Sequence, residues 1–206
     1  MKILIIGSGG QLGSDCTTVL SPHHEVRGCD FPEIDITSRD SVASLIENNQ
    51  PEVIINCAAY TAVDKCETET DLAWKVNADG PEYLAQATSA IGARLVHIST
   101  DYVFDGNKDI PGSYLESDSP NPLSEYGRSK LAGEEAVNRY AQDYVILRTA
   151  WLYSATGPNF LKTMLRLAVS SPEKELKVVN DQYGSLTWSY PLAQQIEQLL
   201  DSRIQG

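Results

Sequence analysis

The sequence lacks a long apolar run near its start, a paired cysteine spacing and a histidine cluster. Its longest early apolar run, Ile3 to Ile6, is too short for a signal peptide or a membrane span. The four cysteines show no CxxC spacing, and the three histidines fit no ligand spacing. These absences predict reduced thiols, no metal site, no membrane contact and a cytoplasmic location.

Basic residues are also few, since 16 Lys and Arg stand against 28 Asp and Glu, for a net charge of −12. A nucleic-acid binder needs clustered basic residues, so the sequence predicts no nucleic-acid partner. A small phosphorylated ligand remains compatible, because backbone amides can bind it. The 206 residues, 42% hydrophobic and 21% charged, are typical of a folded protein that buries its core without disulfides.

Apolar and amphipathic segments alternate along the chain, a pattern typical of an α/β fold with a doubly wound parallel sheet (Rossmann). The expected strands are 2–6, 25–30, 52–57, 94–99, 144–147 and 176–179. The expected helices are 11–20, a helix opened by a capping box at Thr37 and Asp40 and running to 49, 73–90 with Pro81 at a start or kink, 124–140, 159–169 and 190–200. Ligands of such folds bind at the carboxyl ends of the strands.

A glycine-rich loop follows the first strand and opens the first helix. Its spacing is GxxGxxG at Gly7, Gly10 and Gly13, and Asp30 ends the second strand. This context predicts a dinucleotide site in which backbone amides meet a pyrophosphate and Asp30 binds the adenosine ribose. A plain strand–helix turn and a solvated Asp30 are the alternatives. Arg27 precedes Asp30 and is not expected to bind a 2′-phosphate, so the choice between NAD and NADP stays open.

Tyr126 and Lys130 stand four residues apart on an expected helix and therefore share a face. A nearby ammonium favours the phenolate, so we expect Tyr126 to exchange a proton with a carbonyl or carbinol oxygen while hydride moves. The hydroxyl of Thr100, just beyond a strand, is expected to orient the same oxygen. The alternatives are an exposed Tyr/Lys pair and a strand-end cap.

These motifs, with Asn56-Cys57-Ala58-Ala59, resemble the extended short-chain dehydrogenase/reductase superfamily. More closely, five segments spread over essentially the whole chain are similar to the dTDP-4-dehydrorhamnose reductase family: 59–65, 99–106, 126–134, 148–151 and 180–184. The resemblance implies reduction by NADPH or NADH of the 4-keto group of a dTDP-4-keto-6-deoxy sugar. The product would be dTDP-L-rhamnose for cell-surface polysaccharide.

The resemblance also implies the roles of individual residues. Tyr126 would donate the proton, Lys130 would hold the nicotinamide ribose, and Thr100 would assist at the carbonyl. The substrate would contact Thr100, Asp101, Tyr126 and Trp151. The cofactor would be bound by Gly7, Gly10, Gln11, Leu12, Gly13, Asp30, Asp35, Ile36, Ala59, Tyr60, Thr61, Tyr126 and Lys130.

Length is the main departure from this family, whose members continue well beyond the equivalent of Gly206. We therefore expect residues 1–150 to form the NAD(P)-binding Rossmann domain. Residues 151–206 would hold its last elements, mixed with part of a substrate-binding region. A homodimer is an expectation that the sequence does not test.

Two other functions stay open. A nucleotide-sugar 4,6-dehydratase or epimerase has the same frame, but dehydratases resemble Thr-Asp-Glu where this chain has Thr100-Asp101-Tyr102. The regulatory subunit of methionine adenosyltransferase is similar in sequence and binds NADP without catalysis. The acidic pair Glu134-Glu135 is interpreted as a solvated helix face.

Overall fold

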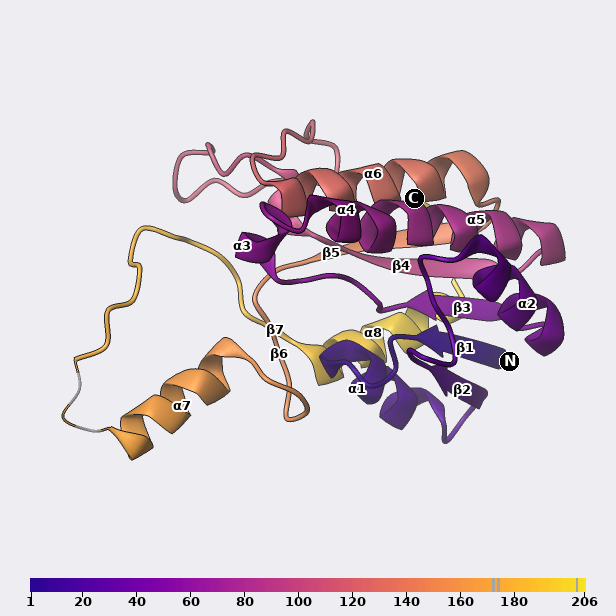
Figure 1. Cartoon of the computed structure of the whole chain (residues 1–206), viewed down its shortest axis with the longest axis horizontal. Helices are drawn as coiled ribbons and strands as arrows, with labels where there is room; N and C mark the ends of the chain where they lie inside the picture. The colour runs from indigo at the N-terminus through magenta and orange to yellow at the C-terminus, as the bar shows by residue number, and fades with distance from the viewer. Residues whose placement is uncertain (172, 174, 203) are drawn as a thin grey trace.

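A five-stranded parallel sheet forms the centre of the computed structural model, which describes residues 1–171, 173, 175–202 and 204–206 (Figure 1). Its strands lie in the order β2-β1-β3-β4-β5. They are β1 (Lys2–Ile6), β2 (Glu25–Cys29), β3 (Val53–Asn56), β4 (Arg94–Thr100) and β5 (Tyr144–Thr149). The expected doubly wound α/β class is confirmed.

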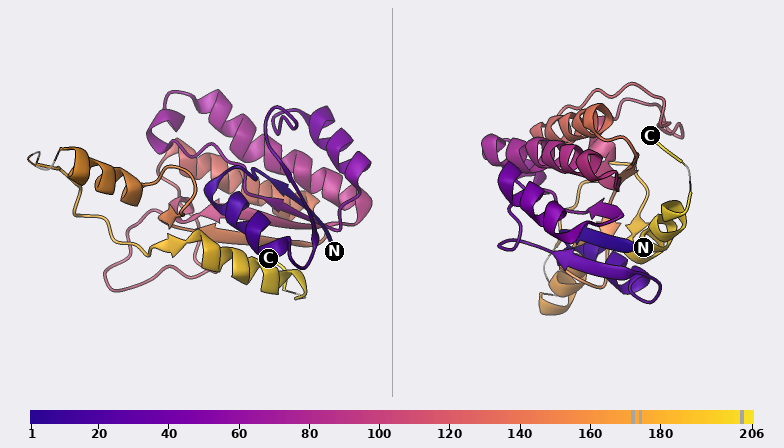
Figure 2. Two further views of the ribbon diagram at one scale, coloured as in Figure 1. Left: turned by 90° about the horizontal axis from the view of Figure 1, so that it is seen from below. Right: turned by 90° about the vertical axis from the view of Figure 1, so that its right-hand side faces the viewer.

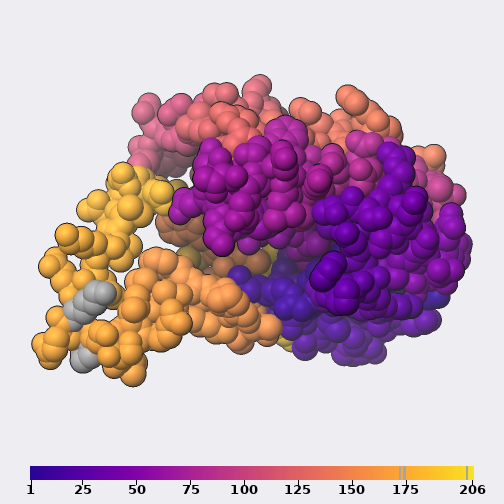
Figure 3. All heavy atoms as spheres, viewed as in Figure 1, coloured from indigo at the N-terminus to yellow at the C-terminus, as the bar shows by residue number. Residues whose placement is uncertain are grey.

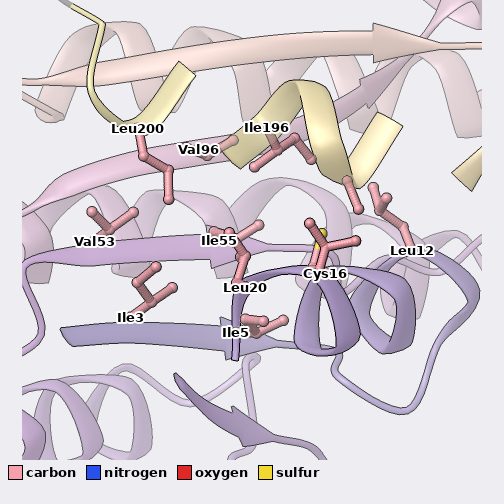
Figure 4. Packing of buried hydrophobic residues seen from close by; sticks show 12 residues of the cluster. Ile3, Ile5, Leu12, Cys16, Leu20, Val53, Ile55, Val96, Ile196 and Leu200 are labelled. Carbon is pink, nitrogen blue, oxygen red and sulfur yellow. The ribbon is translucent and has the colours of Figure 1, made fainter. Parts of the chain in front are cut away.

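Helices cover both faces of this sheet (Figure 2). On one face lie α1 (Gln11–Leu20) and α8 (Ser189–Leu200), packed on the cluster drawn in Figure 4. On the other face lie α2 (Arg39–Asn49), α5 (Gly80–Ile91) and α6 (Glu125–Tyr140). Because the central strands are buried on both sides, they read as continuous apolar runs rather than alternating ones.

The direction in which the chain adds strands reverses after β2. Strand β1 has β2 as its neighbour on one side and β3 as its neighbour on the other. The chain runs outward from β1 to β2, then returns past β1 to β3. Loops that leave β1 and β3 therefore diverge at the carboxyl edge and open a crevice there. In sheets of this kind such a crevice is the usual ligand site.

Two helix expectations need correction. Helix α2 is capped by Ser38, whose side chain accepts a hydrogen bond from the Ser41 N–H, and not by a box at Thr37. The expected helix at 73–90 is three pieces, because a π-helical turn, η1 (Lys75–Asp79), separates α4 (Thr70–Trp74) from α5. A short helix α3 (Val63–Cys66) precedes α4.

Between β5 and α8 the chain leaves the sheet. Helix α7 (Phe160–Ser170) projects from the body, as the space-filling view in Figure 3 also shows. The expected strand at 176–179 is wrong, since that segment has no strand partner and its side chains are exposed. Two short strands instead pair with each other, β6 (Leu152–Tyr153) and β7 (Thr187–Trp188). Within the described residues, no helix is both long and apolar enough to cross a bilayer.

Helix α6 packs against η1 at unusually short range. A Cβ placed on Gly133 would lie 2.2 Å from the Asn77 carbonyl oxygen, a distance that only a glycine permits. This close approach brings the inner face of α6, with Tyr126 and Lys130, against the loop that follows β3.

We therefore predict that Gly133→Ala destabilises the protein by about 1–3 kcal/mol, the usual cost of overpacking a closed core. Urea unfolding followed by circular dichroism measures the change. Glu135→Ala, at an exposed position of the same helix, is the matched control and should stay within about 0.5 kcal/mol of the parent. Equal stability of the two variants would contradict the close packing.

Candidate active site

A cavity of about 380 Å³ opens at the carboxyl edge of the sheet, between the loops that follow β1, β3, β4 and β5. Most of the residues that the sequence singled out line it. They are Gly10, Gln11, Leu12, Gly13, Ala59, Thr61, Thr100, Asp101, Tyr126, Lys130 and Trp151. The fold thus brings together residues that lie far apart in the chain, from Gly10 to Trp151.

The glycine loop is shaped by backbone approaches that side chains would block. Gly7 has a φ of +81°, and a Cβ there would lie 2.7 Å from the Ala58 nitrogen. A Cβ on Gly13 would lie 2.2 Å from the Gly7 carbonyl oxygen. Gly10 is the N-cap of α1, and no side chain among the described residues caps that helix end. Its first backbone N–H groups are therefore available to an anionic ligand at the cavity wall.

Asp30 is bound to the glycine loop rather than solvated. Its Oδ2 accepts hydrogen bonds from the Ser8 hydroxyl at 2.5 Å and from the Gly9 N–H at 2.8 Å. Arg27 pairs with Glu33 and donates to Asn49 at 2.5 Å, so its guanidinium is engaged away from the glycine loop. Asp30 therefore holds the loop in place, and only one of its carboxylate oxygens is taken by these contacts.

Five of the predicted cofactor residues do not line the cavity: Gly7, Asp30, Asp35, Ile36 and Tyr60. The Asp35 carboxylate accepts from both the N–H and the hydroxyl of Thr37, and these hydrogen bonds lower its pKa. Ile36 is buried in the core under Gly80. Both positions lie after β2, beyond the cavity, and their roles toward a cofactor stay predictions.

Tyr60 is held by a side chain that the sequence analysis did not single out. Asn77, on the π-helical turn, accepts from the Tyr60 N–H at 2.8 Å and donates to the Tyr60 carbonyl at 3.0 Å. The same amide donates to the Ser129 hydroxyl at 3.1 Å, one residue before Lys130. Asn77 is 1% exposed and joins the loop after β3 to α6. The exposed Tyr60 hydroxyl bonds to Glu69, away from the cavity.

Lys130 is buried although it carries a charge. Its side chain is 2% exposed, and its Nζ donates to the Ile98 carbonyl of β4 at 2.7 Å. Burial lowers its pKa from 10.5 to about 8, while Glu134 and Cys57 act in the opposite direction. The ammonium therefore persists at neutral pH, at the wall of the cavity.

Tyr126 lies on the same helix one turn away and is 9% exposed. We expected the Lys130 ammonium to lower the pKa of Tyr126, but burial prevails and raises it to about 12. Thr100 favours the phenolate but does not outweigh burial. The phenol is accordingly protonated at neutral pH, the form that can give a proton away.

Thr100 and Asp101 stand together where β4 passes into the 3-10 turn η2 (Asp101–Val103). The Thr100 hydroxyl donates to Asp101 Oδ1 at 3.2 Å and accepts from the Tyr102 N–H at 3.2 Å. Burial raises the pKa of Asp101. Thr100 therefore caps the turn at the strand end, as the alternative interpretation expected, and it also lines the cavity.

Trp151 lines the cavity from the loop after β5 and is 42% exposed. Its φ of +46° is in the left-handed region, which a bulky residue occupies only when its surroundings enforce it. Gly184 lies against the indole, since a Cβ there would be 3.1 Å from Trp151 Cε2. The Trp151 carbonyl also accepts from the Thr187 N–H at 3.3 Å. Gly184 and Thr187 therefore help to hold the tryptophan in place.

Several cavity residues escaped the sequence analysis. Ser99 and Thr149 line the cavity beside Thr100, and the Tyr102 ring meets Tyr126 edge to face at 5.6 Å between centroids. A hydroxyl residue next to Thr100 was the available signal for Ser99.

The interpretation of Glu134 as solvated was wrong. Its side chain is 5% exposed and pairs with Arg148 through two hydrogen bonds, of 2.9 and 2.6 Å. This buried ion pair joins α6 to β5. Glu135 is exposed, as expected.

Comparison with known proteins gives a consistent result. The family model described as "RmlD substrate binding domain" matches residues 1–206. The dTDP-4-dehydrorhamnose reductase of Aggregatibacter actinomycetemcomitans is 44% identical over all of this chain and 69% of its own length. Four further curated relatives with the same name are covered over 62% to 64% of their length, so the chain spans about two thirds of such proteins.

Two solved structures agree over the whole chain. A dTDP-4-dehydrorhamnose reductase of Clostridium acetobutylicum is 46% identical with a TM-score of 0.94, and the match covers 72% of that protein. The reductase of Bacillus anthracis, solved in complex with NADP, is 42% identical with a TM-score of 0.95, and 73% of it is covered. With a family model matched end to end, the chain belongs to the RmlD family of dTDP-4-dehydrorhamnose reductases.

Proposed function

We propose that this protein uses NADPH or NADH to reduce the 4-keto group of a dTDP-4-keto-6-deoxy sugar, giving dTDP-L-rhamnose for cell-surface polysaccharide. The observation that carries the proposal is one cavity that gathers an uncapped helix N-terminus with Thr100, Tyr126 and Lys130. The chain's membership of the reductase family and the NADP complex of the Bacillus anthracis relative support it.

The glycine loop fits a dinucleotide. Its backbone lies so close to the strand that a Cβ on Gly13 would clash at 2.2 Å, and the open N–H groups after Gly10 suit a pyrophosphate. The Asp30 carboxylate has an oxygen left for the adenosine ribose, and the Lys130 ammonium would hold the nicotinamide ribose. When bound, the cofactor supplies a hydride.

The chain's own residues supply the proton and orient the carbonyl. Tyr126, protonated because burial raises its pKa to about 12, gives its phenol proton to the oxygen that becomes the hydroxyl. On substrate binding, the Thr100 hydroxyl would turn its one proton from Asp101 Oδ1 to the same substrate oxygen and hold that oxygen near the phenol. The Lys130 ammonium then stabilises the phenolate that remains, because opposite charges attract strongly in a buried site.

The sugar nucleotide would lie against Asp101 and Trp151, which both line the cavity. The indole, against which Gly184 packs, would offer a flat apolar wall for the sugar ring. Tyr102 follows Asp101 where dehydratases carry an acid, so this site is equipped for reduction and lacks that second acid.

Turnover is tested by NADPH or NADH absorbance at 340 nm with the dTDP-4-keto sugar. One cofactor oxidised for each product formed supports a reductase. Product formed without net oxidation would instead indicate an epimerase or dehydratase, and cofactor binding without any turnover would favour a regulatory protein.

We predict that Tyr126→Phe lowers kcat about 10²- to 10⁴-fold, the usual contribution of a general acid, and leaves cofactor affinity nearly unchanged. The phenylalanine keeps the ring and removes only the hydroxyl group that would donate the proton. Steady-state kinetics and a fluorescence titration with NADPH measure the two effects. Tyr140→Phe, at the far end of the same helix, is the control and should retain full activity.

We also predict that cofactor affinity falls as the pH rises through about 8. Burial lowers the pKa of Lys130 to about 8, so the free protein holds the ammonium below that pH and loses it above. Lys130→Met should bind NADPH and NADH more weakly at pH 7, with no such dependence. Lys75→Met, at an exposed position, should behave like the parent. A parent affinity that is flat from pH 7 to 9 would contradict the role of Lys130.

A further inference from the structure

Several buried polar side chains near Lys130 have no role in the proposed chemistry. His97 on β4 is 0% exposed, and its Nδ1 lies 3.1 Å from the side-chain nitrogen of Asn56 on the neighbouring strand β3. Ser99, two residues further along β4, is 3% exposed. Buried polar groups cost free energy unless they form hydrogen bonds.

The hydrogen bonds fix which nitrogen of His97 carries its proton. The Asn56 carbonyl oxygen accepts from the Ala58 N–H at 3.1 Å, which leaves the amide nitrogen to face His97 and donate to Nδ1. His97 then carries its proton on Nε2. The ring is neutral, because burial and the nearby Lys130 ammonium hold the pKa of His97 well below its usual range.

Five buried side-chain atoms have no hydrogen-bond partner among the described residues, and two of them are close together on β4: His97 Nε2, which is a donor, and the Ser99 hydroxyl oxygen. The two side chains point to the same face of β4, since they are two residues apart on one strand. The residue between them in the sequence is Ile98, and its carbonyl accepts a hydrogen bond from Lys130 Nζ at 2.7 Å. The ammonium has three donors, and this contact uses one.

We propose that His97 and Ser99 hold a buried water molecule against the Lys130 ammonium, and that Asn56, His97 and Ser99 are positioning residues for that ammonium. The water would accept from Lys130 Nζ and from the His97 Nε2–H, and would donate to the Ser99 oxygen. Three partners are the number that buried waters typically have. The inference rests on the proposed function only in giving Lys130 the task of binding the cofactor.

This arrangement would fix the direction of all three ammonium donors. One meets Ile98, one meets the water, and the third is left to point into the cavity toward a ribose hydroxyl. Without the water, the ammonium could turn about its carbon–nitrogen bond and its last stretch of chain could shift. Asn56, His97 and Ser99 would thereby control cofactor affinity through the position of the Lys130 ammonium.

Fluorescence titration with NADPH and NADH at pH 7 tests the proposal. We expect His97→Leu, which removes the donor, to weaken binding about tenfold, as the loss of a hydrogen bond to a charged group does. His97→Gln, whose amide can accept from Asn56 and donate to the water, should stay within about threefold of the parent. Ser99→Ala should weaken binding by an intermediate factor.

His24→Leu is the matched control, because His24 lies before β2 at the opposite edge of the sheet. The pH profile gives a readout that general destabilisation would not move. Losing the water removes an acceptor from the ammonium, so the midpoint near pH 8 should move to lower pH in His97→Leu and stay in His97→Gln. Glu134 and Cys57, which also act on Lys130, are unchanged in every variant.

The outcomes separate this inference from the proposed function. Suppose that Lys130→Met loses cofactor affinity while His97→Leu and Ser99→Ala bind like the parent with the same pH midpoint. The proposed water site is then overturned, and the proposed function stands. If Lys130→Met itself binds like the parent, the proposed role of Lys130 fails first. A crystal structure of the parent without a water between the three side chains would also overturn the inference.

Discussion

The Lys130 ammonium is buried to 2% exposure and donates to the Ile98 carbonyl, so one charged contact couples α6 to the end of β4. A cation in this position must be bound by its surroundings, because burial alone disfavours the charge. The Glu134 carboxylate, on the next turn of α6, offsets part of that cost because it raises the pKa of Lys130. Glu134 is itself paired with Arg148 on β5. The ion pair and the lysine together align the helix that carries Tyr126 with the two strands whose ends form the cavity.

A second set of contacts extends the same alignment to the cofactor side. The Asn77 amide joins the loop after β3 to Ser129 on α6, and Gly133 lets the helix approach that turn closely. Asp30 ties the glycine loop to the end of β2. Hydrogen bonds thus hold the loop after β1 to the end of β2, and the loop after β3 to α6.

The charge of the chain gains a local meaning from this geometry. A net charge of −12 is unfavourable to the anionic cofactor and sugar nucleotide proposed for the site. Attraction therefore has to come from short-range sources: the backbone N–H groups at the start of α1 and the single ammonium of Lys130. Since both act only within a few ångströms, a protein of acidic surface can still bind two anions in one cavity.

Local patterns in the sequence were enough to predict the five sheet strands, the glycine loop and the shared face of Tyr126 and Lys130, because each depends on residues close together in the chain. The strand expected at 176–179 failed since a strand needs a partner, and none pairs with it there. Spacing could not predict the burial of Glu134, the hydrogen bonds of Asn77 or a His97 Nε2 without a partner among the described residues. Each depends on what packs against the residue from a distant segment. Composition and periodicity determined the fold class and the chemistry available, whereas the tertiary structure decided which groups are buried, and burial set the pKa of Tyr126 and Lys130.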